Sequence, residues 1–301
     1  FEEGYALSRN PLFPHRITRY ELTPDKVDCV LFCSKNYRPA LSRLRGITAS
    51  FNTYFHYTIT AYGKDIEPGV PPIEESVDTL IALSELVGGR RVAWRYDPVL
   101  LTGDYTIRRH LETFERLAKV LAPHIDRCIF SFVEMYRKVE LNMLEIVPFS
   151  VDAMDSLARG LGAIAARHAG AWCLADDSGL EVDALGGAPG VRSARYAGEP
   201  SSTPANNALL LKNLEGVRNR AARFVCAVAL VDPAGREHVV RGACPGRIAA
   251  APSGAGGFGY DPLFIPDGHA VSFADLGEAA KNAISHRARA LAAAKRILAL
   301  S

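Results

Sequence analysis

The sequence predicts an α/β protein, in which a partial (β/α) barrel-like N-terminal domain precedes a mixed α/β C-terminal domain. Two observations predict this class. Short apolar segments alternate with helical segments through the first half, an order typical of parallel sheets with right-handed crossovers. After Gly170 the pattern changes to paired strands, a glycine-rich loop and a terminal helix. We therefore expect two domains, residues 1–169 and 170–301.

The first half has segments that read as strands and others that read as helices. The strands combine apolar, aromatic and β-branched residues, and the third is expected to end at Asp97-Pro98. The expected strands are residues 27–34, 52–60, 91–96 and 128–133. The helices have apolar residues at helical spacing, and Ser150 is a good N-cap for the last of them. The expected helices are residues 73–87, 105–121 and 150–168.

Polar side chains follow each of these strands. They are Lys35, Asn36, Thr60, Tyr62, Arg95, Asp97 and Glu134. In barrels of this kind the carboxyl ends of the strands carry the site. The alternative is that these residues are loop polars and helix caps, with Arg95 and Asp97 forming a satisfied ion pair. A third hypothesis gives this half an activity of its own at Lys35, Arg95 and Asp97.

The second half begins with a short apolar strand that leads into Asp176-Asp177-Ser178-Gly179. A turn sequence at residues 232–235 joins two strands into a pair. The expected strands are residues 171–175, 224–231 and 238–244, and the expected helices are residues 203–214 and 282–300. The glycine-rich loop spans residues 254–259.

Asp176 and Asp177 form the first candidate site, at the end of an apolar strand. Adjacent carboxylates are costly to bury unpaired, and a divalent cation would remove that cost. Mg²⁺ prefers one or two carboxylates together with phosphate oxygens, and a carboxylate beside it could act as a general base. The alternative is a solvated turn or a helix cap.

The glycine-rich loop holds Phe258, Tyr260 and Asp261. Gly254, Gly256 and Gly259 match G-x-G-x-x-G, but Pro262 follows instead of a helix, so we reject a dinucleotide-binding turn. Flexible glycines around aromatic and acidic side chains suit a pocket that stacks and hydrogen-bonds a flat ring. The alternative is a surface loop anchored by its aromatic residues.

The third candidate lies at the start of the terminal helix, where Lys281, Ser285 and His286 cluster. Donors at a helix N-terminus favour anions or carbonyl-rich bases. A solvated basic helix start is the alternative.

Taken in this order, the three motifs resemble the C-terminal two thirds of the inosine/xanthosine triphosphate pyrophosphatase (Ham1-like) family. The resemblance covers residues from about Ala171 to Leu300 and rests on LADDSGLEVDALGGAPGVRSARYAG, ANNALLLKNL, GGFGYDPLF and KNAISHR. It implies a truncated mixed α/β pyrophosphatase domain. It also implies Mg²⁺-dependent hydrolysis of deaminated purine nucleoside triphosphates (ITP, dITP or XTP) to monophosphate and pyrophosphate.

The resemblance assigns residue roles. Asp177 would be the catalytic proton acceptor, and Asp176 and Asp177 the metal ligands. The implied substrate contacts are Ser178, Phe258, Gly259, Tyr260, Asp261, Lys281, Ser285, His286 and Arg287. The family's opening strand, its Ser/Thr-x-x-Asn-x-x-Lys phosphate loop and its metal-binding Glu have no counterpart upstream of Ala171. Activity of this chain is therefore left open, with a non-catalytic fusion or a misassembled chain of two unrelated fragments as the alternative.

Residues 1–169 resemble an uncharacterised bacterial domain family with a barrel-like βα pattern and suspected kinship to radical-SAM barrels. The resemblance rests on stretches such as GYALSRNP, YGKDIEP and WRYDP. The usual beginning of that family and its C-terminal cysteine cluster are both absent from the sequence. The function of this part is therefore left open.

Composition narrows the partners and the location. A net charge of +2 gives no global drive toward a nucleic acid polymer, and no apolar run approaches the ~20 residues of a membrane span. The 6 dispersed cysteines are expected to be reduced, and no signal peptide is visible, so we expect a cytoplasmic protein. The resemblance suggests homodimer formation.

Overall fold

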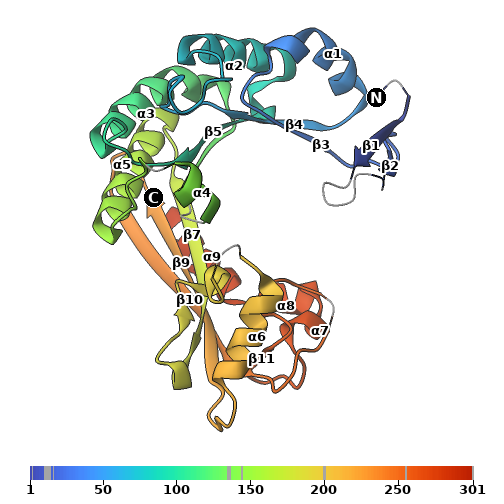
Figure 1. The fold of residues 1–301 in the computed structure, drawn as a ribbon, viewed down its shortest axis with the longest axis vertical. Coiled ribbons are helices and arrows are strands. Elements are labelled where there is room, and N and C mark those ends of the chain that lie inside the picture. Colours follow the sequence, from blue (N-terminus) through green and yellow to red (C-terminus); the bar gives the residue numbers. More distant parts are fainter. Residues whose placement is uncertain are drawn as a thin grey trace. The chain divides into compact units, whose positions relative to one another are not determined.

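The computed structural model describes residues 1, 3–9, 15, 17–133, 137–143, 145–198, 201–254 and 256–299. The chain divides into two compact units, which are described separately below. Unit 1 comprises residues 1–135 and 143–170, and unit 2 comprises residues 136–142 and 171–301. Both units combine strands and helices, so the α/β class predicted from the sequence is confirmed (Figure 1).

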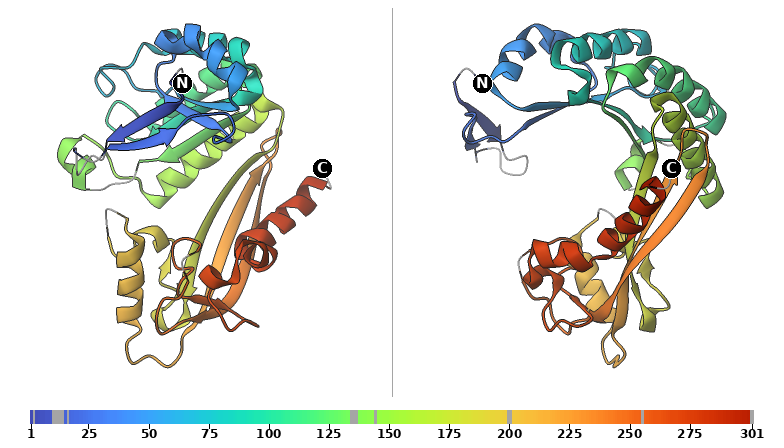
Figure 2. Two further views of the ribbon diagram at one scale, coloured as in Figure 1. Left: turned by 90° about the vertical axis from the view of Figure 1, so that its right-hand side faces the viewer. Right: turned by 180° about the vertical axis from the view of Figure 1, so that it is seen from behind.

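Unit 1 is built on a parallel sheet in the order β3-β4-β5-β6. Its strands are β3 (Val30–Ser34), β4 (Thr53–Thr58), β5 (Val92–Val99) and β6 (Arg127–Phe132). The connecting helices are α1 (Leu41–Ser50), α2 (Ile73–Val87) and α3 (Ile107–Leu121). Figures 1 and 2 show these helices gathered over one face of the sheet. The expected strands and helices of this half are confirmed, three of them with shorter bounds (β3, β4 and α3); α1 was not predicted.

A hairpin and a further helix also belong to unit 1. An antiparallel hairpin joins β1 (Tyr5–Arg9) to β2 (Ile17–Glu21). Helix α5 (Val151–Ala169) packs on α3. Ser150 caps α5 as predicted, because its side chain accepts a hydrogen bond from the Ala153 N–H, and Gly170 ends the helix in the left-handed conformation.

An aromatic core lies between the sheet of unit 1 and its helices. Trp94 stacks on Phe114 of α3 with ring centroids 4.7 Å apart, and its Nε1–H donates to the Ile59 carbonyl at 2.9 Å. Tyr96 packs edge-on against the same phenylalanine. Because strand side chains alternate between faces, Arg95 and Asp97 leave β5 on the face away from these helices.

Strand β5 corrects one prediction. It continues through Asp97-Pro98 to Val99, where the sequence suggested an end. Pairing with β6 is irregular between Tyr96 and Val99, and a proline is tolerated at such a break because no ladder hydrogen bond needs its missing N–H.

Unit 2 contains a five-stranded antiparallel sheet in the order β11-β10-β9-β7-β8. The strands are β7 (Cys173–Val182), β8 (Pro189–Gly190), β9 (Ala221–Val231), β10 (Glu237–Ile248) and β11 (Phe264–Pro266). The predicted pair of strands is confirmed as β9 and β10. The predicted end of a strand at Ala175 is wrong, because β7 runs through the two aspartates and pairs with β9 along its whole length.

Helices in unit 2 frame this sheet. They are α4 (Arg137–Asn142), α6 (Thr203–Asn213), α7 (Phe273–Leu276), α8 (Glu278–Ile284) and α9 (His286–Ala299). Single 3-10 turns in the two units lie at Arg38–Ala40, Gly89–Arg91, Ala122–His124, Asp183–Leu185 and Ser193–Arg195. The prediction of one terminal helix over residues 282–300 is wrong, because extended Ser285 separates α8 from α9.

Helix α9 lies along the long strands of unit 2, as Figure 2 shows. Small residues on the helix permit this packing: Ala290 and Ala294 are buried against Cys226, Val228 and Leu230 of β9. Within the described residues, no helix is both long enough and apolar enough to cross a membrane.

Candidate active site in unit 2

Asp176 and Asp177 lie inside β7 and not in a loop, so their side chains leave opposite faces of the strand. Asp176 shares its face with α9, where its Oδ2 accepts a hydrogen bond from Arg287 Nε at 2.7 Å. Asp177 is exposed on the other face, and its Oδ1 accepts from the Ser178 N–H at 2.8 Å. The structure therefore brings Asp176 to the terminal helix but sends Asp177 to the other side of the sheet.

The start of α9 packs closely against β10 because Gly242 of that strand has no side chain. A Cβ at Gly242 of β10 would stand 2.3 Å from both the His286 carbonyl oxygen and the Ala290 nitrogen. Glycine thus allows the first turn of α9 to approach the strand. His286 then stacks on Phe224 of β9, with ring centroids 4.8 Å apart and an interplanar angle of 14°.

His286 is buried among charged neighbours. Burial lowers the pKa of its imidazole to about 4, and the positive charges of Arg287 and Lys281 act in the same direction, against an opposing effect of Asp176. The imidazole is therefore neutral near pH 7. One acidic and two basic side chains therefore lie near the His286 ring.

Lys281 in α8 joins the glycine-rich loop to this cluster. Its Nζ lies 2.5 Å from Asp261 Oδ2 and 4.6 Å from the centroid of the Phe258 ring. Asp261 is buried, and the same oxygen accepts from the Phe258 N–H at 2.8 Å. Gly257, with φ +74°, closes the turn, where a Cβ would lie 2.2 Å from that oxygen.

The two aromatic residues of the loop differ in their surroundings. Phe258 is 69% exposed, so its ring is available for stacking. Tyr260 is 4% exposed, and its hydroxyl donates to the Ser193 carbonyl at 2.8 Å. Burial raises the pKa of Tyr260 above its usual range. Tyr260 thus anchors the loop, while contact of these residues with a base stays a prediction.

Adjacent asparagines in α6 support the site and were not singled out from the sequence. Asn206 is buried, and its side-chain amide accepts a hydrogen bond from the Ala197 N–H and donates one to the Ala194 carbonyl. Asn207 Nδ2 donates to the Gly259 carbonyl at 3.2 Å, which ties α6 to the glycine-rich loop. Two consecutive asparagines in a helix are the signal, because such residues are poor helix formers unless their amides are used elsewhere.

Buried polar atoms near these elements lack a hydrogen-bond partner among the described residues. They include Ser178 Oγ, Asn207 Oδ1 and His286 Nδ1. Buried polar groups in folded proteins are almost always paired, so these atoms indicate partners that the described residues do not supply. They belong to or adjoin the residues predicted to contact substrate.

Ser285 separates the two terminal helices and caps the second one. Its Oγ accepts from the Ala288 N–H at 3.2 Å, and its carbonyl accepts from the Arg289 N–H at 3.1 Å. This role is compatible with a buried, fixed position between Lys281 and His286.

The residues present offer an incomplete set of metal ligands. Among the described residues, no group of three or more His, Cys, Asp or Glu side chains could hold a metal ion. Asp176 is paired with Arg287, which leaves Asp177 as the accessible carboxylate. Mg²⁺ binds through one or two carboxylates when substrate phosphates and water supply the other oxygens. Asp177 therefore suits Mg²⁺ that arrives with a triphosphate, while the residues present do not fit a resident ion.

Three of the polar residues predicted in unit 1, Lys35, Arg95 and Asp97, form ion pairs. Arg95 pairs with Asp97, as one of the two interpretations of the sequence had it, and Lys35 pairs with Glu67. Asn36 Oδ1 accepts from the Arg38 N–H at the start of a turn. Glu134 lies outside the described residues.

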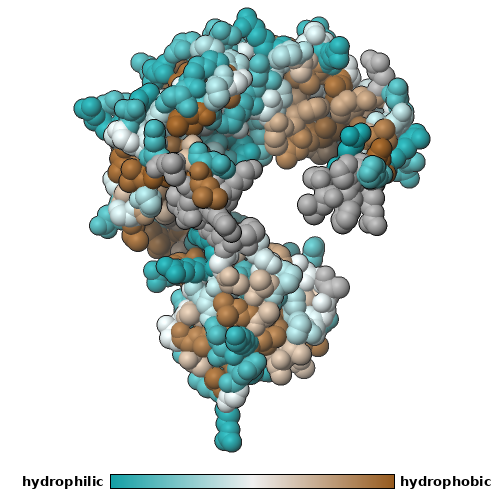
Figure 3. Space-filling model, in the orientation of Figure 1, coloured by the Kyte–Doolittle hydropathy of each residue, from teal (hydrophilic) through white to brown (hydrophobic). Residues whose placement is uncertain are grey.

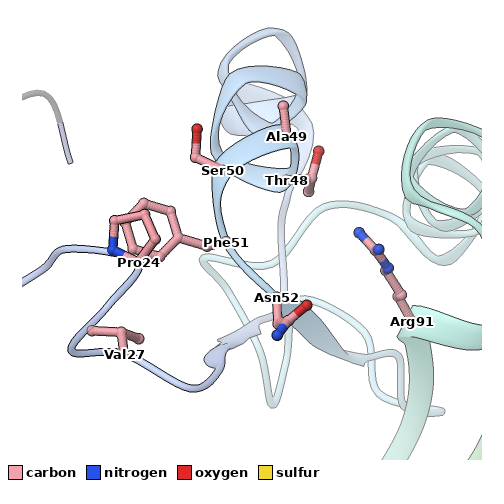
Figure 4. Close-up of a pocket in the computed structure, with 8 residues that line it drawn as sticks. All are labelled: Pro24, Val27, Thr48, Ala49, Ser50, Phe51, Asn52 and Arg91. Carbon is pink, nitrogen blue, oxygen red and sulfur yellow. The ribbon is translucent and has the colours of Figure 1, made fainter.

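Two hollows in the structure lie away from these side chains. One of about 270 Å³ in unit 1 is lined by the end of α1 and by Arg91, at the amino ends of the parallel strands (Figure 4). The other, of about 580 Å³ in unit 2, is lined by residues 218–221 and 246–250 and by Ile265 and Asp267. Neither contains a residue predicted to act on substrate.

Comparison with known proteins divides the chain between two families. Residues 147–297 match the model described as the Ham1 family. Residues 1–177 match the model described as a domain of unknown function (DUF1848).

Curated relatives resemble the second part of the chain. A protein of Desulforamulus reducens named dITP/XTP pyrophosphatase is 55% identical over 136 residues, which is 44% of this chain and 68% of the relative. One of Nocardia farcinica with the same name is 57% identical over 139 residues, 46% of this chain and 66% of the relative. The chain thus spans about two thirds of the length of these relatives. A Porphyromonas gingivalis protein of that name is 47% identical over 161 residues, 53% of this chain and 82% of the relative.

Among solved structures, the Staphylococcus aureus Ham1 protein is 36% identical with a TM-score of 0.46, covering 60% of this chain and 90% of that one.

Proposed function

Because the chain belongs to the Ham1 family over residues 147–297 and to the DUF1848 family over residues 1–177, we propose that unit 2 hydrolyses deaminated purine nucleoside triphosphates to monophosphate and pyrophosphate, and that the two parts are separate domains. The names of the curated relatives support dITP and XTP as substrates. The observation that carries the proposal is that Asp176, Arg287, His286, Lys281 and Asp261 lie together beside β7.

The edge of β7 is the proposed place for the triphosphate. Among the described residues, β8 pairs with β7 only at Leu180 and Glu181, so residues 173–179 form an edge of the sheet. A ligand lying along this edge can be reached from both faces of the strand. Asp176 and Asp177 can thus act on one triphosphate although their side chains leave the strand in opposite directions.

The base would lie against Phe258 and Lys281. The Phe258 ring is available for stacking, and Lys281 is held in place by Asp261. Lys281 and neutral His286 can donate hydrogen bonds to the O6 atom of hypoxanthine or xanthine. A 6-amino purine would leave those buried donors unpaired, and such polar mismatches discriminate strongly between substrates.

Hydrolysis requires a water to attack the α-phosphorus, which breaks the bond to the oxygen that bridges it to the β-phosphate. Asp177 is the proposed acceptor of the proton of that water, because its carboxylate is exposed and, among the described residues, only its Oδ1 accepts a hydrogen bond. Arg287 would stabilise the charge of the pyrophosphate as it leaves. Mg²⁺ bound with the triphosphate would neutralise phosphate charge next to the aspartates.

The test measures pyrophosphate release from inosine triphosphate by the whole chain with Mg²⁺. We expect Asp177→Asn to lower kcat at least ~100-fold, the effect of losing a general base. Glu181→Gln is the matched control, since Glu181 lies on the same strand but pairs with Arg223. The proposal fails if the wild-type chain releases no more pyrophosphate than the Asp177→Asn variant.

A further inference from the structure

Unit 1 carries two cationic side chains that are held in the same way. Lys35, which follows β3, pairs with Glu67, and Glu67 also accepts from the Thr60 hydroxyl at 3.0 Å. Arg95 of β5 pairs with Asp97, and Asp97 also accepts from the Ser131 hydroxyl of β6. Each arrangement consists of a cation, a carboxylate and a hydroxyl. We call the two arrangements the lysine triad and the arginine triad.

The register of the sheet brings the two triads together. Ser34 pairs with Tyr57 and Tyr57 with Trp94, so the next residues, Lys35, Thr58 and Arg95, stand at one level. Neighbouring strands are about 4.8 Å apart, so the Cα atoms of Lys35 and Arg95 are separated by about 10 Å across β4. Two long side chains can span that gap and meet on one small group.

Tyr62 gives independent evidence that the triads are neighbours. Its pKa is raised mainly by burial, and the charges of both Glu67 and Asp97 raise it further. Both carboxylates are therefore near enough to Tyr62 for their charges to act on its hydroxyl. The Tyr62 hydroxyl is fixed between the Pro98 carbonyl and the Leu100 N–H, each at 2.8 Å.

Burial and hydrogen bonding leave donors, not acceptors, open to a ligand. The side chains of Glu67 and Asp97 are each 13% exposed, and both oxygens of each carboxylate accept a bond. The side chains of Lys35 and Arg95 are 36% and 33% exposed, and each makes one hydrogen bond within the described part of the chain. An ammonium has three N–H donors and a guanidinium five, so most of their donors remain available.

The face on which Arg95 lies is exposed along β3 and partly to fully buried along β4 and β5. Helices α1, α2 and α3 cover the opposite face, and Leu31 and Cys33 of β3 are exposed (Figure 1). Figure 3 shows apolar residues gathered on this side, below α1 and α2. His56 also belongs to it, and its pKa is lowered by burial and then by the charges of Arg95 and Arg127.

From this geometry we propose that Lys35 and Arg95 form a second ligand site, distinct from the nucleotide site of unit 2, that binds the phosphate or carboxylate group of a small molecule at the carboxyl ends of β3 and β4, beside the middle of β5. Each cation is oriented by its carboxylate, so its remaining donors are fixed in direction before a ligand arrives. Preorganised donors of this kind bind anions better than freely rotating surface lysines. The carboxyl ends of parallel strands are also the usual place for ligands in α/β folds.

The test is a titration of the whole chain with inorganic phosphate and, separately, with acetate, followed by backbone amide NMR shifts. We expect saturable shifts at Ser34, Lys35, Thr58 and Arg95 with at least one of the two anions. Tighter binding of phosphate identifies a phosphate-bearing ligand, and tighter binding of acetate a carboxylate-bearing one. Sodium chloride at equal ionic strength controls for general screening.

Substitutions test the residues. Arg95→Gln and Lys35→Gln should each weaken the binding at least tenfold. Because either change leaves a buried carboxylate without its partner, the double variant Arg95→Gln/Asp97→Asn, which removes the whole ion pair, is measured as well and should also lose the binding. Arg116→Gln is the matched control, since Arg116 forms an exposed ion pair with Glu74 on the helices.

Two results would overturn the proposal. One is that neither anion gives saturable shifts at these four amides in the wild-type chain. The other is that the folded double variant binds as tightly as the wild-type chain. Hydrolysis of inosine triphosphate should be unchanged in these variants, so the outcome is independent of the function proposed for unit 2.

Discussion

His286 shows how its surroundings set the charge of a single side chain. Its ring is stacked on Phe224 and buried, while Arg287 and Lys281 add positive charge nearby. All three effects oppose protonation. The neutral ring can then serve as a hydrogen-bond donor or acceptor toward a base, which an imidazolium could do only as a donor.

A pH dependence of folding stability follows from the lowered pKa of His286. Since the pKa of His286 is about 4 in the folded chain, against 6.5 for an unperturbed histidine, the unfolded chain binds more protons between these pH values. Stability should therefore fall as the pH drops from 6.5 to 4, and the penalty is absent above 6.5. Its full size corresponds to roughly 3 kcal/mol. An NMR titration of the imidazole should give a midpoint near 4, with His286→Phe, which keeps the ring stack, used to assign the signal. A midpoint near 6.5 would contradict this account.

Residue types and their spacing predicted several of the polar contacts correctly. Arg95 and Asp97 formed the ion pair that their spacing allowed, and Lys281, His286 and Arg287 came together with Asp176. The partner of Lys35 could not be foreseen, because Glu67 is 32 residues away and reaches it through the loop after β4. Asn206 and Asn207 were missed for a similar reason, since their partners lie in other loops.

At the scale of elements, boundaries near the site were the weakest predictions. The sequence suggested that β7 would end before Asp176, because charged residues usually end an apolar strand. The strand continues because β9 offers an unbroken ladder from Cys173 to Val182, and that tertiary pairing outweighs local preference. The break between α8 and α9 was hidden for the opposite reason: alanine-rich sequence favours helix on both sides of Ser285.

The contact between α9 and β10 makes a testable element. Gly242→Ala would place a methyl group 2.3 Å from two backbone atoms of α9, which forces the helix away from the strand. Overpacking of this kind costs about 1–3 kcal/mol, and it should also displace His286 and lower turnover of inosine triphosphate. Thermal unfolding and pyrophosphate release measure the two effects.

The matched control is Ala243→Gly at the neighbouring position. Ala243 is exposed, and a glycine there should cost up to ~1 kcal/mol without moving α9. If both variants lose stability but only Gly242→Ala loses turnover, the contact positions the site. Equal turnover in the two variants would show that the position of α9 does not matter for catalysis.

At the scale of the whole molecule, the chain joins units with separate cores and different sheet types. Unit 1 has a parallel sheet with an aromatic core around Trp94, and unit 2 has an antiparallel sheet with buried residues such as Leu210 and Phe264. This difference was predictable from the order of elements, because alternating strands and helices favour parallel sheets and a turn between two strands favours antiparallel pairing. The two proposed sites lie one in each unit, so ligand binding should stabilise the units independently.

Scanning calorimetry tests this independence. A ligand that binds only one folded unit increases the free energy of unfolding of that unit by RT ln(1 + [L]/Kd) and so raises its transition temperature. We expect two transitions. The temperature of one rises with inosine triphosphate and Mg²⁺ and does not rise with Mg²⁺ alone, because the aspartates fit an ion only together with a triphosphate.

Two core substitutions assign the transitions, since Leu80 and Leu210 are both fully buried, in α2 and α6 respectively. Leu80→Ala should lower only the transition of unit 1 and Leu210→Ala only that of unit 2, each by about 2–5 kcal/mol in stability. A single transition lowered by both substitutions would show instead that the units fold as one, and a rise with Mg²⁺ alone would show a resident metal site.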